Sequence, residues 1–205
     1  MRLTTKDHIN YWKNRKIDWK ESYFTPDHPH RDLIIDALHT MKFSTVYEIG
    51  CGAGANLWKV IKHYPNTRVG GVDVNEEAIE EAKKNLPGNS LMETRSAEDI
   101  FMNDKSIDVL LSDMCSIYFG PLKIDKVIKE IKRVTRNNVI FVEFHSRSFW
   151  SRLKLFWKSG YNAYNWPKLL RKHGFYDIEM KKLSEKDWPG GNPQKTYAYL
   201  IICKI

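Results

Sequence analysis

The chain lacks the features that define several classes of protein. Its 205 residues include only three cysteines, and Cys51, Cys115 and Cys203 stand alone, without the C-x-x-C spacing of zinc or iron–sulfur sites. We therefore expect reduced, buried thiols, and neither disulfides nor a metal site. The chain has no run of 18 or more apolar residues, and its first residues form no apolar signal-peptide core. These absences predict a cytoplasmic protein without a membrane-spanning segment.

Two common nucleotide-binding loops are also missing, although the chain has a glycine-rich corner. Residues 45–58 run from an apolar, strand-like stretch through three glycines into an amphipathic helical pattern. A dinucleotide fingerprint counted from Gly52 requires a glycine where the chain has Leu57, and the sequence Gly-Lys-Ser/Thr of a phosphate loop does not occur. Glycines at alternate positions of a strand-to-helix corner still let a ligand approach the backbone closely. A nucleotide-like ligand of another kind is expected there.

Two acidic residues narrow the kind of ligand. Glu48 precedes the first glycine by two positions, and a carboxylate there repels a pyrophosphate but suits a ligand that carries an ammonium or another cation. Asp73 lies near the end of the next strand-like run, residues 68–74. It follows Gly54 by roughly 20 residues, the interval at which a carboxylate meets ribose hydroxyls in doubly wound folds.

These residues resemble the motifs of a known family, the class I S-adenosylmethionine-dependent methyltransferases. The resemblance rests on Glu-Ile-Gly-Cys-Gly-Ala-Gly at 48–54, on Asp73, and on Ser-Ala-Glu-Asp at 96–99. It extends in order and spacing over about residues 46–144, half of the chain. It implies an enzyme that uses S-adenosylmethionine and releases S-adenosylhomocysteine.

The resemblance also implies which residues bind the cofactor. The glycine loop is expected to cradle the methionine part, Asp73 to bind the ribose hydroxyls, and the Ser96-Ala97 region to bracket the adenine. The full set expected from the core of the chain is Glu48, Gly50, Cys51, Gly52, Gly54, Asn56, Asp73, Val74, Ser96, Ala97, Glu98, Asp113 and Met114.

The order of strand-like and helical patterns predicts an α/β fold. Apolar strand-like runs alternate with amphipathic helices, which favours a doubly wound, mostly parallel seven-stranded sheet with helices on both faces. The last strand is expected to be antiparallel, as in the methyltransferase fold. The expected strands are 45–49, 68–74, 90–94, 107–112, 139–144, 176–183 and 196–205, and the expected helices are 4–17, 31–41, 57–64, 76–85, 122–135 and 166–173.

We expect one domain, residues 1–205, made of four parts. Residues 1–44 form a helical N-terminal cap, 45–145 the cofactor-binding core, 146–166 an aromatic and basic lid segment, and 167–205 a helix with a closing strand pair. Two hypotheses are open for the cap. In many class I methyltransferases this region folds over the ligands, so Tyr11 and Arg15 would contact the cofactor and Trp12 the substrate, with Arg15 as a carboxylate partner. Alternatively, the helix only docks on the core through Trp12.

Residues 19–31 read as a polar linker, because Pro26 and Pro29 interrupt any helix. His28 and His30 flank Pro29 without the spacing of a metal pair. We expect both histidines to be solvated.

The acceptor is expected beyond the ends of the fourth and fifth strands, where ligands of open α/β sheets bind. His145 is the first candidate for a catalytic base, because its ordinary pKa lies near neutrality. Asp113 and Tyr118 are the other catalytic candidates, and each of the three can instead orient the acceptor or its loop. The residues expected to bind the substrate are Trp12, Tyr118, His145, Trp150 and Tyr161.

Segment 146–166 contains four basic and seven aromatic residues and no acid. Three hypotheses are open for it: a lid over the acceptor, a basic amphipathic helix on an anionic membrane, or a stacking surface for unpaired nucleic acid. The net charge of +8 does not decide between them, because lysine-rich helix faces account for many such excesses.

The sequence thus predicts methyl transfer from S-adenosylmethionine to oxygen or nitrogen of a small molecule by a monomer or homodimer. The alternatives are an RNA or membrane-associated, lipid-like acceptor reached through residues 146–166, and a domain that binds a cofactor or partner without catalysis.

Overall fold

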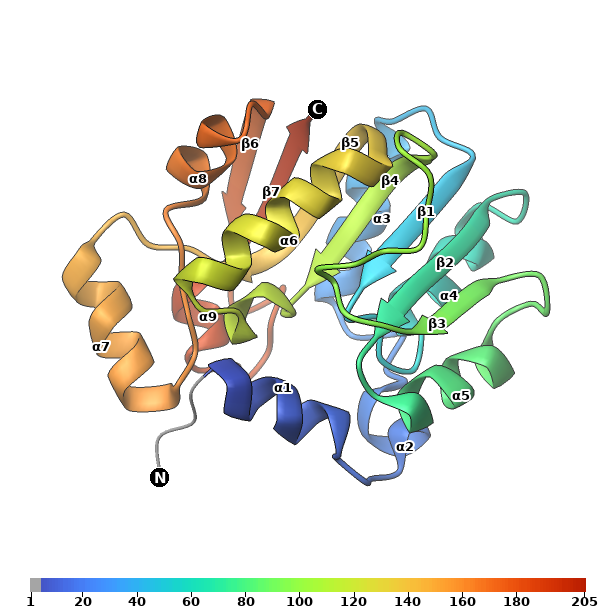
Figure 1. Cartoon of the computed structure of the whole chain (residues 1–205), viewed down its shortest axis with the longest axis horizontal. Coiled ribbons are helices and arrows are strands. Elements are labelled where there is room, and N and C mark those ends of the chain that lie inside the picture. The colour runs from blue at the N-terminus through green and yellow to red at the C-terminus, as the bar shows by residue number, and fades with distance from the viewer. Residues whose placement is uncertain (1–4) are drawn as a thin grey trace.

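A computed structural model describes residues 5–205 (Figure 1). Its centre is a seven-stranded sheet in the order β3-β2-β1-β4-β5-β7-β6. Only β7 runs antiparallel to the other strands, since it pairs in that sense with both β5 and β6. The predicted sheet, with its antiparallel last strand, is confirmed. The strands are β1 Thr45–Ile49, β2 Arg68–Asp73, β3 Leu91–Thr94, β4 Ile107–Asp113, β5 Thr135–Phe144, β6 Tyr176–Lys182 and β7 Ala198–Lys204.

Helices cover both faces of the sheet, as expected for parallel strands that are buried on two sides. One apolar core lies between the sheet and α3, α4 and α5, and the other lies under α6 and α8. The remaining helices lie at the rim (Figure 1). The helices are α1 Thr5–Lys13, α2 Trp19–Tyr23, α3 His30–His39, α4 Ala55–His63, α5 Glu76–Asn85, η1 Ser116–Tyr118, α6 Pro121–Val134, α7 Phe149–Ser159, α8 Trp166–Lys172 and α9 Gln194–Tyr197.

The carboxyl ends of β1 and β4 point toward α1, which lies across that end of the sheet (Figure 1). The glycine corner, the end of β4 and the N-terminal helices therefore meet in one place. This edge is where an open α/β sheet binds its ligands.

The predicted linker at 19–31 is wrong in its first part, where α2 forms. The Asp18 side chain caps this helix by accepting a hydrogen bond from the N–H of Glu21 at 2.8 Å. Trp19 is buried against Ala53 and Ala78, and this contact between distant parts of the chain holds the short helix in place.

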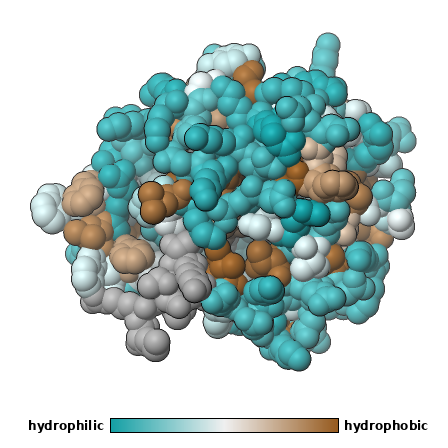
Figure 2. Space-filling model, viewed as in Figure 1, coloured by the Kyte–Doolittle hydropathy of each residue, from teal (hydrophilic) through white to brown (hydrophobic). Residues whose placement is uncertain are grey.

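Helix α7 occupies the middle of the predicted lid segment and lies at the periphery, at the left of Figure 1. Leu155 is its only buried residue. Figure 2 shows apolar side chains over the same region of the surface. No helix among residues 5–205 is long and apolar enough to cross a membrane.

A candidate cofactor and acceptor site

The glycine loop is packed on one side and open on the other. The N–H groups of Gly50 and Cys51 donate to the carbonyl of Val72 at 2.7 and 3.1 Å, which ties the loop to the end of β2. A Cβ on Gly50 would lie 2.6 Å from the Cys115 Sγ, whereas a Cβ on Gly52 would meet no atom within 4 Å. Both glycines have positive φ, +66° and +51°, a conformation that other residues rarely adopt. The space beside Gly52 suits a ligand that lies against the backbone.

Asp73 joins the loop to the start of α5. Its Oδ2 accepts a hydrogen bond from the Gly52 N–H at 3.0 Å, and its Oδ1 accepts one from the Asn75 N–H at 2.9 Å. Burial raises the pKa of Asp73, while these backbone donors act in the opposite direction. Each carboxylate oxygen has a second lone pair, so Asp73 retains the capacity to accept hydrogen bonds from two ribose hydroxyls.

The N-terminal segment covers the loop and brings unpaired donors to it. The side-chain amide of Asn75 donates to the carbonyls of Trp12 and Arg15 at 2.7 and 2.9 Å, and the Arg15 guanidinium lies over the rings of Tyr11 and Trp12. The indole nitrogens of Trp12 and Trp19 and Nε of Arg15 are buried, with no hydrogen-bond partner among residues 5–205. Three buried donors therefore have no acceptor among residues 5–205, and a bound ligand can supply one.

Unpaired carboxyl oxygens lie at the ends of β1 and β4: that of the anionic Asp113 is an acceptor, and that of Glu48 is a donor while the group is protonated and an acceptor once it ionises. The Asn56 side-chain amide donates to Glu48 Oε1 at 2.6 Å and to Asp113 Oδ2 at 3.0 Å. The other oxygen of each carboxylate, Glu48 Oε2 and Asp113 Oδ1, is buried without a partner in the described part of the chain. A ligand with a carboxylate, hydroxyls and cationic groups satisfies both the donors and these acceptors, and S-adenosylmethionine has all of these groups. The residues present therefore fit the cofactor.

The burial of Glu48 predicts a pH dependence of stability. Burial raises the pKa of Glu48 from 4.5 to about 8, although Asn56 lowers it in part. The folded protein then holds a proton that the unfolded chain releases between these pH values. The stability contributed by neutral Glu48 is present below pH 4.5 and is lost as the pH rises to about 8, by at most about 1.4 kcal/mol per pH unit.

We expect the free energy of unfolding, measured with urea between pH 7 and 8, to fall with rising pH, and to fall less steeply in Glu48→Gln. Burial also raises the pKa of Glu143 to about 8. Stability therefore keeps a residual dependence on pH in the variant. Equal slopes in the two proteins would refute the buried, protonated Glu48.

His30 belongs to the site, contrary to the expectation that it is solvated. Its Nε2 lies 2.7 Å from Asp113 Oδ2, only 3% of the residue is exposed, and its ring stacks on Trp188 at 4.2 Å. The sequence did contain a signal: His30 precedes Leu33 and Ile34 by three and four residues, so it shares the helix face that packs on the core. His28 adjoins His30 and is partly buried.

Asp113 is held as an anion. Burial alone would raise its pKa, but His30, Arg31 and Asn56 together lower the pKa well below the ordinary value. Arg31 Nη1 lies 3.2 Å from Asp113 Oδ2. Such a carboxylate is a weak proton acceptor and a strong partner for positive charge.

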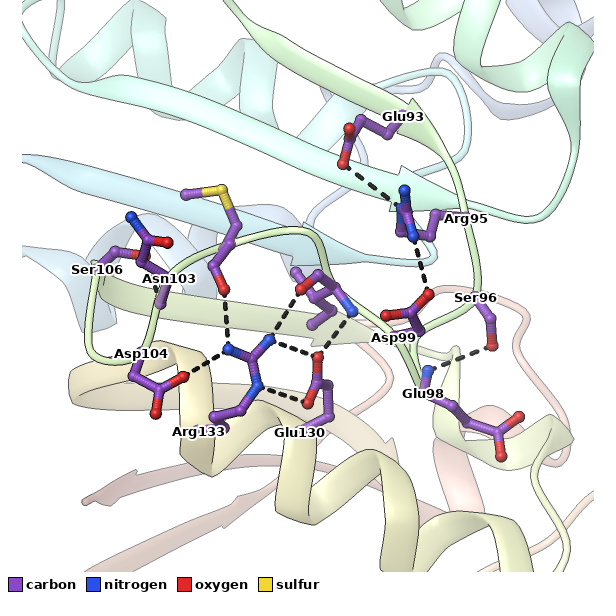
Figure 3. A network of polar contacts seen from close by, with 12 residues as sticks. Glu93, Arg95, Ser96, Glu98, Asp99, Asn103, Asp104, Ser106, Glu130 and Arg133 are labelled. Atoms are coloured by element: carbon purple, nitrogen blue, oxygen red, sulfur yellow. Dashed lines mark hydrogen bonds and ion pairs between the residues drawn. The ribbon is translucent and has the colours of Figure 1, made fainter.

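The loop after β3, expected to bracket the adenine, is fixed by α6 (Figure 3). Arg133 donates to the carbonyls of Ile100 and Met102, both at 2.9 Å, and Glu130 accepts a hydrogen bond from the Ile100 N–H at 2.8 Å. At the start of the loop, Ser96 Oγ accepts from the Glu98 N–H at 3.2 Å. Ala97 is buried, and Glu98 pairs with Lys123 at 2.8 Å.

Two further expected cofactor residues lie at strand ends. Val74 follows β2 directly and is partly buried, and Met114 follows β4. Met114 has a φ of +51° and donates its N–H to the carbonyl of Val142 at 2.9 Å. Both therefore lie beside residues of the site described above.

An aromatic cluster adjoins this site on the side of η1. The Tyr118 ring lies 5.4 Å from Trp12 and 5.7 Å from Tyr161, and His8 lies 5.4 Å from Tyr118. The cluster unites α1, η1 and the residues after α7, although these are far apart in sequence. Burial raises the pKa of Tyr118 above its ordinary range, so its hydroxyl stays protonated and is a donor. Three expected substrate residues, Trp12, Tyr118 and Tyr161, therefore lie together.

The other two expected substrate residues lie elsewhere. Trp150 is 75% exposed on α7. Among the described residues, His145 shares no hydrogen bond or ring contact with Asp113 or Tyr118. Its Nδ1 accepts a hydrogen bond from the Trp166 N–H at 3.3 Å, and its ring contacts Tyr199.

Glu143 supports the end of β4. Its Oε1 accepts hydrogen bonds from Ser112 Oγ and from the N–H groups of Cys115 and Ser116, at 2.7, 3.0 and 2.8 Å. It thereby fixes the loop that carries Cys115 against the glycine loop.

Residues 5–205 contain no cluster of three or more histidine, cysteine or acidic side chains able to hold a metal.

Several known proteins that resemble this chain are methyltransferases. A family model described as a methyltransferase domain matches residues 46–138. The ribosomal protein L11 methyltransferase of Dictyoglomus turgidum is 28% identical over 177 residues, which cover 84% of this chain and 52% of that protein. The chain therefore spans about half the length of this relative.

Solved structures show the same fold at low sequence identity. The magnesium protoporphyrin IX methyltransferase of Synechocystis, solved with bound S-adenosylmethionine, matches with a TM-score of 0.63 at 13% identity, over 99% of this chain and 92% of its own. An S-adenosylmethionine-dependent methyltransferase of Archaeoglobus fulgidus matches with a TM-score of 0.60 at 18% identity, over 85% of this chain and 94% of its own. These likenesses show the fold of the chain, and the methyltransferase-domain model over residues 46–138, the glycine loop and the sheet order together support a class I S-adenosylmethionine-dependent methyltransferase.

Proposed function

We propose that this protein transfers the methyl group of S-adenosylmethionine to a nitrogen or oxygen of a small molecule bound among Trp12, Tyr118 and Tyr161. One observation carries the proposal: this aromatic cluster adjoins the glycine loop, because Cys115 packs against Gly50 and η1 begins at the next residue. S-adenosylmethionine supplies a methyl group that is already activated. The protein then has to align an acceptor with it and exclude water.

The protonation states of the site favour an amine nitrogen as the acceptor atom. Asp113 is a weak base, Tyr118 keeps its proton, and His145 contacts neither of them. An amine that is bound in its neutral form attacks with its own lone pair and releases a proton to solvent only after the methyl group has moved. Aromatic faces and the Asp113 carboxylate also attract the positive charge that such an acceptor gains.

The names of the relatives do not select an acceptor. They include methyltransferases of ribosomal protein L11, of trans-aconitate and of small-subunit ribosomal RNA. The proposal is therefore tested by incubating the protein with radiolabelled S-adenosylmethionine and small amines, phenols and carboxylic acids in parallel. Transfer to none of these, but to RNA or vesicles, would overturn the small-molecule assignment.

Replacing Tyr161 with alanine is expected to reduce turnover of the best acceptor by roughly ten- to a hundredfold, because misplaced reactants lose alignment. The dissociation constant of S-adenosylmethionine should change less than about twofold, since the rings that Tyr161 contacts, those of His8, Tyr118 and Phe144, lie outside the glycine loop. Steady-state kinetics with calorimetry separate the two effects. Tyr176→Ala, an exposed site on β6, is the matched control. Unchanged turnover in Tyr161→Ala would place the acceptor elsewhere.

Helix α7 favours a second candidate, an acceptor presented by an anionic membrane. Phe149, Trp150 and Trp157 are 59%, 75% and 52% exposed, and the helix has basic residues and no acid. A peripheral amphipathic helix with aromatic tips suits a flat lipid surface. Its C-terminal end reaches the acceptor cluster, since the Gly160 carbonyl contacts His8 Nε2 at 3.1 Å. Co-sedimentation with anionic vesicles, lost in Trp150→Ala, would support this candidate, whereas salt-sensitive RNA binding instead would favour nucleic acid.

A further inference from the structure

Helices α6 and α8 carry most of the net charge of the chain. Their 14 and seven residues include eight basic and two acidic side chains, a net charge of +6 against +8 for the whole protein. Both helices cover the same face of the sheet, where they bury their apolar sides over one core (Figure 1). A small part of the chain therefore concentrates most of its positive charge on one side of the molecule.

The two acidic side chains of these helices already have partners. Glu130 pairs with Arg133 at 2.7 Å, and Asp125 pairs with Lys172 at 2.8 Å. Four other basic side chains of α6 and α8 are exposed and form no ion pair with any of residues 5–205: those of Lys126, Lys129, Lys168 and Arg171. We call these four residues the basic face. Their positive charges are not neutralised by the described part of the chain.

The basic face spans two helices that are joined to each other. Asp125 of α6 binds the last residue of α8, and Lys132 Nζ donates to the carbonyl that follows α8 at 2.6 Å. Lys129 lies four residues after Asp125 and three before Lys132, so it shares the side of α6 that adjoins α8. Lys168 and Arg171 are three residues apart and share one side of α8. The charges are therefore distributed over neighbouring helices and do not converge on one point.

The exposed sides of α6 and α8 are poor in apolar groups. Among the described residues, Leu122, in the first turn of α6, is the only large apolar side chain of either helix that is exposed. A helix that lies on a lipid surface needs an apolar side to insert, and α7 has one whereas α6 and α8 do not. Distributed cations without apolar neighbours suit a polymer of regularly spaced negative charges, because each phosphate that meets a cation releases counterions.

We propose that the basic face binds the phosphate backbone of a nucleic acid. Contacts to phosphates position a protein on the polymer but do not read its sequence, so the binding is sequence-independent. The proposal does not rest on methyl transfer, because none of the four residues belongs to the glycine loop or to the aromatic cluster. It is compatible with a small-molecule acceptor, since the basic face and the acceptor cluster use different residues.

Fluorescence anisotropy of a labelled RNA of about 20 nucleotides, single-stranded and as a duplex, tests the proposal when the full chain is titrated at about 50 to 200 mM NaCl. We expect saturable binding of at least one form, which weakens as salt rises. The triple variant Lys129→Gln/Lys168→Gln/Arg171→Gln should bind at least about tenfold more weakly at the lowest salt. Its plot of log K against log salt concentration should be less steep by about two, because three phosphate contacts are lost.

The matched control removes the same number of exposed charges outside α6 and α8. Lys42→Gln/Lys62→Gln/Arg68→Gln again replaces two lysines and one arginine, and it should keep the RNA affinity within about twofold and the salt dependence unchanged. Thermal unfolding and the affinity for S-adenosylmethionine should be equal in all three proteins, which separates RNA binding from folding and from the cofactor site. Equal weakening in both variants, or no salt-sensitive RNA binding, would overturn the proposal. Binding to anionic vesicles instead of RNA, lost in the first variant, would overturn it as well and assign the basic face to a membrane.

Discussion

Replacement of Asp73 by alanine is expected to weaken the binding of S-adenosylmethionine by on the order of a hundredfold. A hydrogen bond to a charged group contributes roughly 1.5–3 kcal/mol, and we expect this carboxylate to accept two from the ribose. Asp73 also holds the N–H groups of Gly52 and Asn75, so its loss loosens the loop that the ligand contacts. Isothermal titration calorimetry measures the change directly.

The control for this variant is Asp73→Asn, which keeps one carbonyl acceptor at the same place. It should bind the cofactor with an affinity between those of the wild type and Asp73→Ala. Thermal unfolding of all three proteins without ligand shows whether each remains folded. Wild-type affinity in a folded Asp73→Ala would exclude Asp73 from the ribose site.

A large loss of stability is expected when Gly50, the first glycine of the loop, is replaced. Gly50→Ala should lower the free energy of unfolding by about 2–5 kcal/mol, the sum of overpacking and of a left-handed backbone at a non-glycine residue. The added Cβ would lie 2.6 Å from Cys115 Sγ and 2.8 Å from its Cβ. Urea denaturation measures this loss, and the additional substitution Cys115→Gly should recover part of it.

Gly52→Ala is the informative partner of this variant. Its Cβ meets no atom within 4 Å, so the cost in stability should be only about 1–2 kcal/mol from the positive φ. The methyl group occupies the space expected for the ligand, and the affinity for S-adenosylmethionine should fall at least about tenfold. Undiminished affinity in Gly52→Ala would mean that the ligand does not lie against this side of the loop.

Local patterns predicted the parts of the fold that local physics determines. The helix expected at 76–85 forms with the same bounds, because Asn75 caps it and acidic residues fill its first turn. The strand run at 107–112 forms as β4, where buried apolar residues follow one another, and extends one residue further to Asp113. The glycine corner formed as expected because the positive φ values and the spaced acid are properties of a short stretch.

The features that the sequence did not predict depend on contacts between distant segments. Trp19 forms a helix because it packs on Ala53 and Ala78, and His30 is buried because Asp113 and Trp188 lie against it. None of these four partners lies near Trp19 or His30 in the sequence. His145 ends a buried strand as expected, and its Nδ1 accepts a hydrogen bond from the N–H of Trp166, 21 residues further along the chain.

The central claim is that the glycine loop binds S-adenosylmethionine, and calorimetric titration of the wild-type protein with this ligand and with S-adenosylhomocysteine tests it most directly. Binding at one site with micromolar dissociation constants is expected for both. S-adenosylmethionine should bind at least as tightly, because the anionic Asp113 at the end of β4 would attract its sulfonium charge. If neither ligand bound, the glycine loop would not be a cofactor site in this protein, and the proposed methyl transfer would be contradicted.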